Sequence, residues 1–286
     1  MEQLNIVDGY IDKITIVGNM KRCTEYAYLV KNLHASNDPR VHGPWIDTKS
    51  YGYDLGASIK THDSTAYVQM HRNRKRDGSS DFRIEFNPAK CNEDDMKFIF
   101  ELIGLVEDKR CTRIDLCVNF HRDVMHYELL DGKNRGEWEK RDANKKTETL
   151  YRGSDQSDNF LKFYNKKKEQ KDVKYRDIEH DWCRLEETIQ HKTAHNYDKW
   201  SWFEGVKLVN GQPIFPEDID PKDKGNAYAV INGFMSLSDY KRAYKDKLKE
   251  ILSRVRYEEG IDVGEEIKKT SIVSDAMEVI KKLLSS

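Results

Sequence analysis

Three short segments of the chain repeat one pattern, an arginine, an aliphatic residue and a carboxylate. They are Arg83-Ile84-Glu85, Arg113-Ile114-Asp115 and Arg184-Leu185-Glu186. Side chains alternate across a β-strand, so in each segment the arginine and the carboxylate share one face while the aliphatic residue points to the other. The repeats therefore predict a sheet with one charged face and one apolar face, and the apolar face must be covered by helices.

Strand patterns dominate the first two thirds of the chain. Strands are predicted at residues 10–17, 24–30, 51–55, 66–72, 82–87, 112–120, 148–152, 159–165 and 182–190, where β-branched and aromatic residues mostly alternate with polar ones. A helix is predicted from Asn92, a good N-cap followed by acidic residues in the first turn. The sequence thus predicts an α+β fold with a largely antiparallel or mixed sheet, packed helices and a helical C-terminal region.

A change in composition at residues 205–226, which contain three of the six prolines, separates the strand-rich part from a helical part. We predict a sheet domain at residues 1–205 and a helical region at 206–286. Apolar residues fall at helical spacing from Leu237 to Val255 and again in a last helix at about 273–284. Cationic side chains occupy the other faces of the first of these helices: Lys241, Arg242, Lys245 and Lys249. A solvated helix face is an equally good interpretation of these four residues.

The charge of the chain is nearly balanced overall but unevenly distributed. A formal net charge of -1 over 286 residues argues against a uniformly basic nucleic-acid binder. Residues 160–176, however, contain seven Lys/Arg and two Asp/Glu, and residues 241–256 have the same counts. No uninterrupted apolar segment approaches the length needed to cross a membrane, so we expect no membrane partner and a cytoplasmic location.

The charged face of the predicted sheet has two interpretations. If the three repeat strands are neighbours, Glu85, Asp115 and Glu186 converge and form a hard-oxygen site suited to Mg²⁺ or Mn²⁺. Alternatively, the three arginines neutralise the three carboxylates in a ladder of ion pairs that needs no metal. Glu187 replaces Glu186 on this face if the strand contains a bulge. The histidines include no pair with the spacing of a strand-borne metal site.

The segment FLKFYNKKKEQ at residues 160–170 places a tyrosine at the end of a strand among lysines. On a regular strand Lys162, Tyr164 and Lys166 share a face. Nearby ammonium groups favour the phenolate form of a tyrosine, and they also bind a phosphate. The pattern is compatible with a tyrosine nucleophile, which requires an accessible phenol oxygen close to the carboxylates. A boundary tyrosine flanked by solvated lysines is the simpler alternative.

The chain resembles the replication initiator family of rolling-circle plasmids from Gram-positive bacteria. The resemblance rests on four segments, DFRIEFNP at residues 81–88, TRIDLCVNF at 112–120, YRGSDQSDNFLKFYNKKKEQ at 151–170 and WCRLEE at 182–187, and it is strong over residues 60–190. It implies that Tyr164 nicks one strand of a plasmid origin and that Gly153, Ser154, Ser157 and Asp158 form the turn before it. The chain departs from the family pattern at Lys162, where the family usually has arginine, and at Asp155, where it often has a basic residue.

The resemblance further implies what this chain does and what it binds. The expected reaction is a transesterification that forms a 5′-phosphotyrosine link, releases a 3′-OH and can later be reversed. The expected cofactor is a divalent metal, and the expected partners are double-stranded plasmid origin DNA, a second copy of the chain in a homodimer, and a host helicase. Origin recognition through C-terminal residues implicates Lys241, Arg242, Lys245 and Lys249. A non-catalytic DNA-binding protein of the same ancestry and a structural protein with an ion-pair-rich surface are the alternatives.

Overall fold

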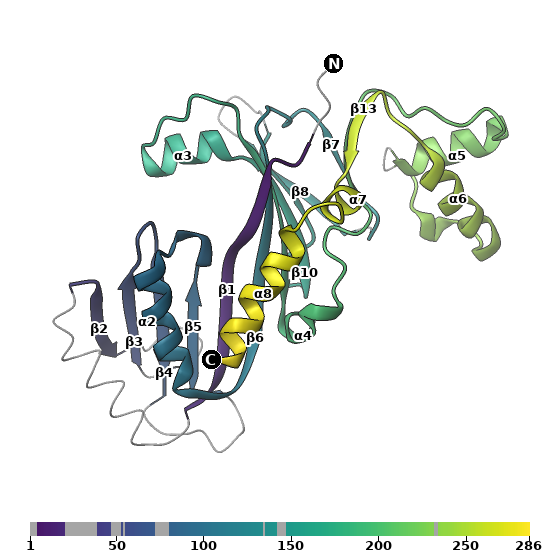
Figure 1. Cartoon of the computed structure of the whole chain (residues 1–286). Coiled ribbons are helices and arrows are strands. Elements are labelled where there is room, and N and C mark those ends of the chain that lie inside the picture. Colours follow the sequence, from purple (N-terminus) through teal and green to yellow (C-terminus); the bar gives the residue numbers. More distant parts are fainter. Residues whose placement is uncertain are drawn as a thin grey trace.

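A computed structural model describes residues 5–20, 39–46, 53, 55–71, 80–133, 135–141, 147–231 and 234–286 of the chain. Its dominant element is a ten-stranded sheet in which all neighbouring strands are antiparallel (Figure 1). In spatial order its strands are β2 (Val41–Ile46), β3 (Leu55–Lys60), β4 (Thr65–Met70), β5 (Phe82–Phe86), β1 (Asp8–Met20), β6 (Val106–Phe120), β11 (Cys183–Gln190), β10 (Asn159–Asn165), β9 (Thr147–Arg152) and β8 (Glu137–Arg141). A second sheet consists of β13 (Glu259–Asp262), β12 (Val206–Asn210) and β7 (Glu128–Asp131). With the helices described below, the predicted α+β fold is confirmed.

The predicted strands agree best with the structure where the alternation of apolar and polar residues is clear. β10 begins and ends at the predicted residues, and β5, β9 and β11 differ from the prediction by one residue at one end. β8 was not predicted, because four of its five residues are charged and the segment has no apolar alternation. The predicted strand at 24–30 lies outside the described residues, as does most of the one at 51–55.

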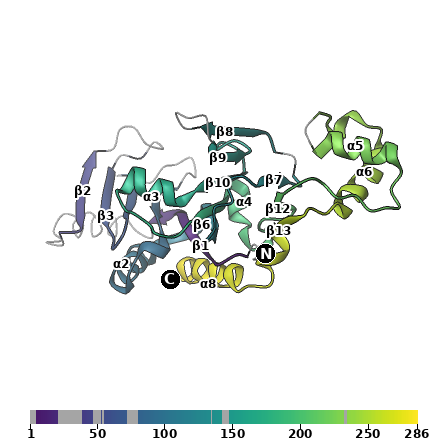
Figure 2. The same ribbon diagram turned by 90° about the horizontal axis from the view of Figure 1, so that it is seen from above.

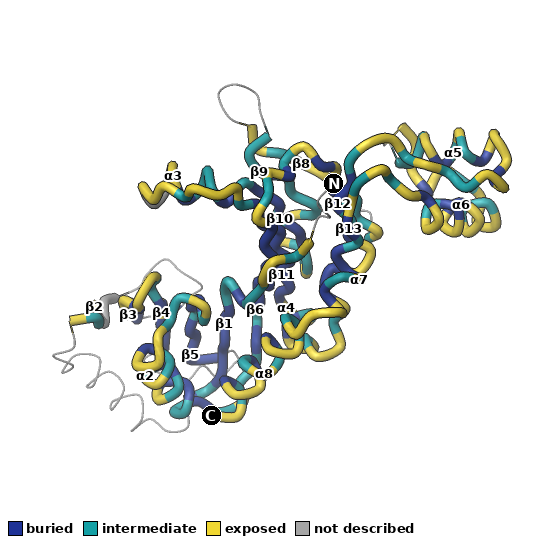
Figure 3. The backbone as a smooth tube through the Cα atoms, turned by 45° about the horizontal axis from the view of Figure 1, so that its top comes forward, coloured by how far each residue is buried: buried dark blue, intermediate teal, exposed yellow. Residues whose placement is uncertain are grey.

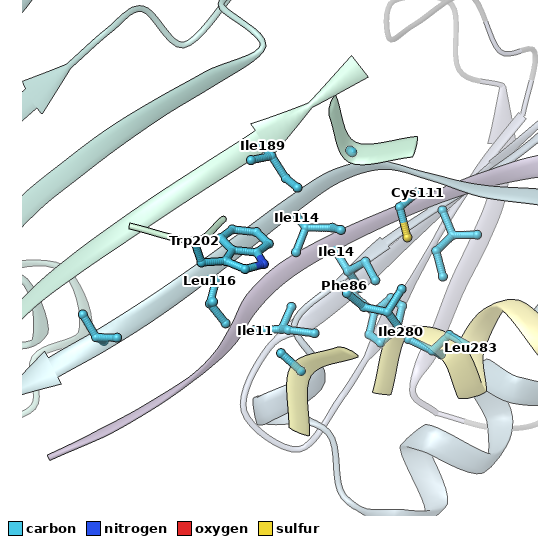
Figure 4. Close-up of a cluster of buried hydrophobic side chains, with 14 of the residues drawn as sticks. Ile11, Ile14, Phe86, Cys111, Ile114, Leu116, Ile189, Trp202, Ile280 and Leu283 are labelled. Atoms are coloured by element: carbon cyan, nitrogen blue, oxygen red, sulfur yellow. The ribbon is translucent and has the colours of Figure 1, made fainter. Parts of the chain in front are cut away.

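The apolar face of the large sheet is buried under helices. The aliphatic residues of the three repeats, Ile84, Ile114 and Leu185, are fully buried, as the alternation predicts. Their cover is α2 (Glu93–Gly104), α4 (His191–His195) and α8 (Ile272–Ser285), and Figure 2 shows α2 and α8 on the same side of the sheet. Ile280 and Leu283 of α8 belong to the same apolar cluster as the central strands (Figure 4). The charged face is therefore left on the other side.

The helix predicted from Asn92 is confirmed as α2, and its first turn explains its position. The Asn92 side chain accepts a hydrogen bond from the backbone N–H of Asp95, and the Asp95 carboxylate accepts one from the backbone N–H of Asn92. This reciprocal pair satisfies two N–H groups that the helix itself cannot. The remaining short elements are η1 (Pro88–Lys90), α3 (Lys166–Lys174), η2 (Tyr197–Lys199) and α7 (Val263–Ile267).

A small helical cluster is inserted between β12 and β13. It consists of α5 (Pro221–Ile231), η3 (Leu237–Asp239) and α6 (Arg242–Arg254), and it projects away from the large sheet (Figures 1 and 3). Its apolar residues form a cluster of their own: Ile219, Ala227, Leu237, Leu248 and Ile251. Beyond this insertion the chain returns to the main core through β13, α7 and α8. The division at residues 205 and 206 stays a prediction, but β12 and α8 pack with the first part of the chain.

Among the described residues no helix is both long enough and apolar enough to cross a membrane.

Candidate active site and nucleic-acid surface

Tyr164 lies on the charged face of the sheet, near the end of β10, and its hydroxyl has two polar partners. The hydroxyl donates a hydrogen bond to Glu186 Oε1 at 2.6 Å and accepts one from Lys166 Nζ at 3.2 Å. Lys162 Nζ lies 4.0 Å from the centre of the Tyr164 ring and 3.7 Å from Glu186 Oε2. The sheet brings these side chains together because Lys162 is directly opposite Glu186, while Tyr164 is opposite Arg184.

The sequence after Tyr164 turns the strand into a helix whose first turn is strongly cationic. The Asn165 side chain caps α3 by accepting from the backbone N–H of Lys168. Three consecutive lysines, Lys166 to Lys168, therefore occupy the helix N-terminus, where the helix dipole already contributes positive potential. Lys166 is buried and is paired with Glu169 one turn later, at 2.6 Å. Of the three lysines, Lys166 contacts the Tyr164 hydroxyl, whereas Lys167 pairs with Asp181 and Lys168 with Glu148.

Tyr164 is only 4% exposed, so the accessible hydroxyl that the sequence predicted is absent from this state of the molecule. Burial raises the pKa of Tyr164 well above its usual range, and the Glu186 carboxylate raises it further. The predicted stabilisation of the phenolate by neighbouring lysines is therefore outweighed. The sequence argument failed because it counted the cations but could not see the burial or the carboxylate.

Burial also changes the proton affinity of the two groups that contact the phenol. It raises the pKa of Glu186, although Lys162 acts in the opposite direction. It lowers the pKa of Lys166, as does the charge of Arg184. Glu186 therefore accepts a proton more readily than an ordinary glutamate, and it already accepts the hydrogen bond of Tyr164. This pair has the geometry of a base and the hydroxyl that it deprotonates.

Arg184 lies next to Glu186 and is only 1% exposed. Its guanidinium donates to Asn119 Oδ1 at 2.8 Å, to Asp12 Oδ1 at 3.0 Å and to the hydroxyl of Tyr10. Arg184 Nη1 also lies 3.8 Å from Glu186 Oε1. A buried arginine with this many acceptors has little freedom, so it fixes the position of Glu186.

Sequence reasoning did not single out Tyr10, Asp12 or Asn119. Tyr10 and Asn119 fall at the alternating polar positions of predicted strands, which is a usable signal. Asp12, two residues after Tyr10, shares its face by the same alternation. The change of register between Ile11 and Lys13 then brings Lys13 to this face as well, where it pairs with Glu85.

The three predicted metal ligands are not gathered at one point. β1 lies between β5 and β6, so Glu85 and Asp115 are on strands that are not neighbours. Glu85 Oε2 is 2.6 Å from Arg83 Nη2 and Glu85 Oε1 is 3.3 Å from Lys13 Nζ. Asp115 receives two hydrogen bonds from Arg113, at 2.8 and 2.9 Å. Over the described ranges no three His, Cys, Asp or Glu side chains are close enough to hold a metal ion. Glu85 and Asp115 therefore agree with the alternative interpretation, in which arginines neutralise the carboxylates in a ladder of ion pairs.

Glu187 points to the opposite face of the sheet from Glu186. It is fully buried, accepts a hydrogen bond from the backbone N–H of Phe203, and lies 3.5 Å from Arg135 and 3.7 Å from Lys133. Burial raises its pKa. Because β11 is regular here, Glu186 and not Glu187 shares the face of Tyr164.

The turn formed by Gly153, Ser154, Ser157 and Asp158 lies at the far end of β10 from Tyr164. Gly153 has φ +90°, a conformation that favours glycine. The Ser157 hydroxyl donates to the Ser154 carbonyl, and the Gln190 side-chain amide donates to the carbonyls of Asp155 and Ser157 at 2.6 and 2.7 Å. These contacts tie the β9–β10 connection to the end of β11, which is a structural role.

The four predicted DNA-contacting cations lie at the start of α6 and along one side of it. Lys241 precedes the helix, and Arg242, Lys245 and Lys249 follow at spacings of three and four residues. Lys241, Arg242 and Lys249 are exposed and Lys245 is half-buried. Within the part of the chain that the structure describes, none of the four has an ion pair, whereas Lys247 on the same helix pairs with Asp223 at 2.6 Å. The opposite side of the helix buries Leu248 and Ile251 in the small cluster.

Comparison with known proteins adds an independent observation. Residues 125–215, which contain Tyr164 and Glu186, match the family model described as replication initiation factor. Two curated replication initiation proteins from Staphylococcus aureus are each 29% identical to this chain. One aligns over 192 residues, 66% of this chain and 59% of the relative, and the other over 253 residues, 86% and 75%. Across four such relatives the chain spans between 49% and 75% of their length.

A solved structure of a rolling-circle replication initiator protein from Geobacillus stearothermophilus has 15% sequence identity and a TM-score of 0.47, and the match covers 86% of this chain and 97% of that chain. At this TM-score the two backbones superpose only in part.

Proposed function

We propose that this chain, which belongs to the family of replication initiation factors, starts rolling-circle replication of a plasmid by nicking one strand of the origin with Tyr164. The observation that carries this proposal is the hydrogen-bonded series Lys166, Tyr164, Glu186 on the charged face of the sheet. It provides a hydroxyl with a base on one side and a cation on the other, which is what nucleophilic attack on a phosphodiester requires.

The proposed reaction is a transesterification. The Tyr164 oxygen attacks the phosphorus atom, and its proton passes to Glu186. The bond from phosphorus to the 3′ oxygen breaks, leaving a 5′-phosphotyrosine link, and the departing 3′ oxygen takes a proton from solvent. The new 3′-OH primes a polymerase. In the reverse reaction a 3′-OH attacks the phosphotyrosine and gives its proton to solvent. The bond from phosphorus to the Tyr164 oxygen breaks, Glu186 returns its proton to that oxygen, and the strand is rejoined without ATP.

Lys162 and Lys166 have two roles in this proposal. In the absence of DNA their ammonium groups lie against the ring and the hydroxyl of Tyr164. When DNA binds, their charge attracts a phosphate, which takes their place beside the hydroxyl. Both sit on long side chains, and Lys162 remains about one-third exposed. DNA binding must therefore draw these side chains off the hydroxyl and onto the phosphate oxygens, where they oppose the charge that develops in the transition state.

The divalent cation, Mg²⁺ or Mn²⁺, stays a prediction of the family resemblance. Glu85 and Asp115 are already neutralised by Arg83, Lys13 and Arg113, and they are not grouped with Glu186. The predicted trio does not fit a metal ion in this arrangement, so no step above depends on one.

Origin recognition is proposed for the cations of α6. Lys241, Arg242, Lys245 and Lys249 project from a helical insertion on the periphery of the molecule, and lysines of this kind mainly position a protein on phosphates. The homodimer and the host helicase remain predictions. A sizing measurement by light scattering tests the first of them.

A second candidate function is favoured by one observation, the burial of Tyr164. A non-catalytic origin-binding protein would keep the cationic surfaces and leave the phenol enclosed.

Incubation with a supercoiled origin plasmid and Mg²⁺ separates the two functions. The nickase produces open circles and a DNA-linked peptide containing residues 160–166, and both disappear in Tyr164→Phe. Tyr10→Phe, which removes a second hydroxyl from the same face, keeps the adduct on Tyr164. Nicking by Tyr164→Phe would rule out the proposed nucleophile. Origin binding without nicking by the wild-type chain would support the second function.

A further inference from the structure

The hairpin at one edge of the large sheet carries an aromatic pair on the same face as Tyr164. Trp138 of β8 and Tyr151 of β9 are directly opposite each other, and their rings stack with centroids 3.7 Å apart and planes 3° from parallel. The Trp138 indole N–H donates to the carbonyl oxygen of Gly153 at 3.2 Å, which orients the ring. Even so, Trp138 is 48% exposed. Half of a large aromatic residue is thus held at the surface.

The strand register connects this pair to the candidate active site. Tyr151 is opposite Lys162 on β10, and Lys162 is opposite Glu186 on β11, so a single cross-strand row runs from Trp138 to the carboxylate. Tyr164 lies two residues beyond Lys162 on the same face. Diagonal neighbours in an antiparallel pair are roughly 7–8 Å apart, so the Tyr151 side of the aromatic pair is close to the phenol.

Two lysines lie on the same face as the pair. Lys162 separates the rings from Glu186, and Lys140, on the same strand as Trp138, has a side chain that is 66% exposed and pairs with Glu148 at 3.3 Å. Proteins bind single-stranded nucleic acid by stacking its bases on aromatic rings and holding its backbone with cationic side chains. Trp138 provides an exposed ring, and Lys162 provides a cation that can exchange its carboxylate partner for a phosphate. A stacked pair that served only the hairpin would gain most by burying both rings, whereas here one ring remains half exposed.

We propose that Trp138, supported by Tyr151, stacks on an unpaired base of the DNA strand near the phosphate that Tyr164 attacks. This inference rests on the proposed function, because nicking at an origin requires the strand to be locally unpaired. The faces of bases are hidden within a duplex, so this platform distinguishes single-stranded from double-stranded DNA. Lys162 holds the backbone between the stacked base and the reacting phosphate.

The test uses the full chain carrying Tyr164→Phe, so that binding is measured without cleavage. A single-stranded oligonucleotide containing 2-aminopurine reports stacking through quenching of its fluorescence, and its anisotropy reports affinity. Trp138→Leu is expected to weaken binding about fivefold or more, the lower range for loss of one stacked base, and to abolish part of the quenching. Trp138→Phe, which keeps an aromatic face, should retain most of both. Affinity for duplex DNA should not change.

Tyr67→Leu is the matched control. Tyr67 is 49% exposed and faces the same side of the same sheet, since it is opposite Glu85, but it lies on β4, several strands from β10. It should bind the oligonucleotide like the parent chain. Equal affinity of Trp138→Leu and the parent, or equal losses in Trp138→Leu and Tyr67→Leu, would overturn the inference. If Trp138→Leu does not fold, Trp138→Thr, which suits a strand but has no aromatic face, takes its place, and affinity and quenching equal to those of the parent would overturn the inference in the same way.

These outcomes also separate the inference from the proposed function. If the wild-type chain nicks the origin and Trp138→Leu binds single strands as tightly as the parent, the proposed function holds and the stacking inference fails. If the wild-type chain does not nick but binds single strands through Trp138, the stacking inference holds and the proposed function fails.

Discussion

Glu186→Gln is expected to slow strand cleavage strongly while leaving DNA binding unchanged. The substituted side chain can still accept the hydrogen bond that Tyr164 donates across 2.6 Å, so the position of the phenol should be preserved. A glutamine cannot take the proton. A positioned general base contributes about 10²- to 10⁴-fold to a rate, which corresponds to roughly 3–5 kcal/mol of barrier. The single-turnover cleavage rate should fall within that range.

The pH dependence of cleavage gives the same test an independent readout. Glu186 acts only when deprotonated, so cleavage should rise with pH through the pKa of Glu186 and then level off. Because burial raises that pKa above the usual 4.5, the rise should occur at a higher pH than for an exposed glutamate. Glu186→Gln should lose this rise. If the phenolate formed without a base, the rate would instead keep climbing tenfold per pH unit toward the raised pKa of Tyr164.

Glu187→Gln is a matched control for this experiment. It makes the same substitution at the next residue, which is also buried but faces the opposite side of the sheet. Its cleavage rate per folded molecule should equal that of the wild-type chain. The reasoning would be refuted by a Glu186→Gln rate close to that of the wild type, or by an equal loss in both variants.

Two further predictions concern the small helical cluster. Replacing Lys245 and Lys249 by alanine should weaken origin binding and lower the slope of log affinity against log salt concentration by about 2. Lys247→Ala, which removes a lysine already paired with Asp223, should change this slope much less. Titrations at several salt concentrations measure the slopes, and equal slopes in the variants and the wild type would show that α6 does not contact DNA. Leu248→Ala empties a fully buried site and should destabilise the cluster by about 2–5 kcal/mol. Hydrogen exchange should then quicken in residues 215–255 but not in β1 or β6, and equal loss of protection in both would show that the cluster does not open on its own.

Much of the local structure was predictable because it depends on near neighbours. Alternation placed Ile84, Ile114 and Leu185 in the core and their arginines and carboxylates on the other face. The Asn92 cap predicted the start of α2. Strand alternation also put Lys162 and Tyr164 on one face, where the structure has them next to Glu186.

The failures arose where residues far apart in sequence had to be placed relative to one another. The convergence of Glu85 and Asp115 assumed that their strands were neighbours, but β1 pairs with both and separates them. Asp12 was missed because alternation assigns it a face but not a partner, and its partner Arg184 is 172 residues away in sequence. β8 was missed because its charged residues carry no strand pattern, and with it the exposed Trp138.

The sequence by itself determined which side chains share a strand face, where α2 begins and where positive charge is concentrated, because these properties follow from backbone periodicity and composition over a few residues. Only the tertiary structure decided the strand order, the enclosure of Tyr164 and the direction of its pKa shift. Strand order depends on how the whole chain closes its loops, and proton affinity depends on solvent exclusion by segments that are remote in sequence.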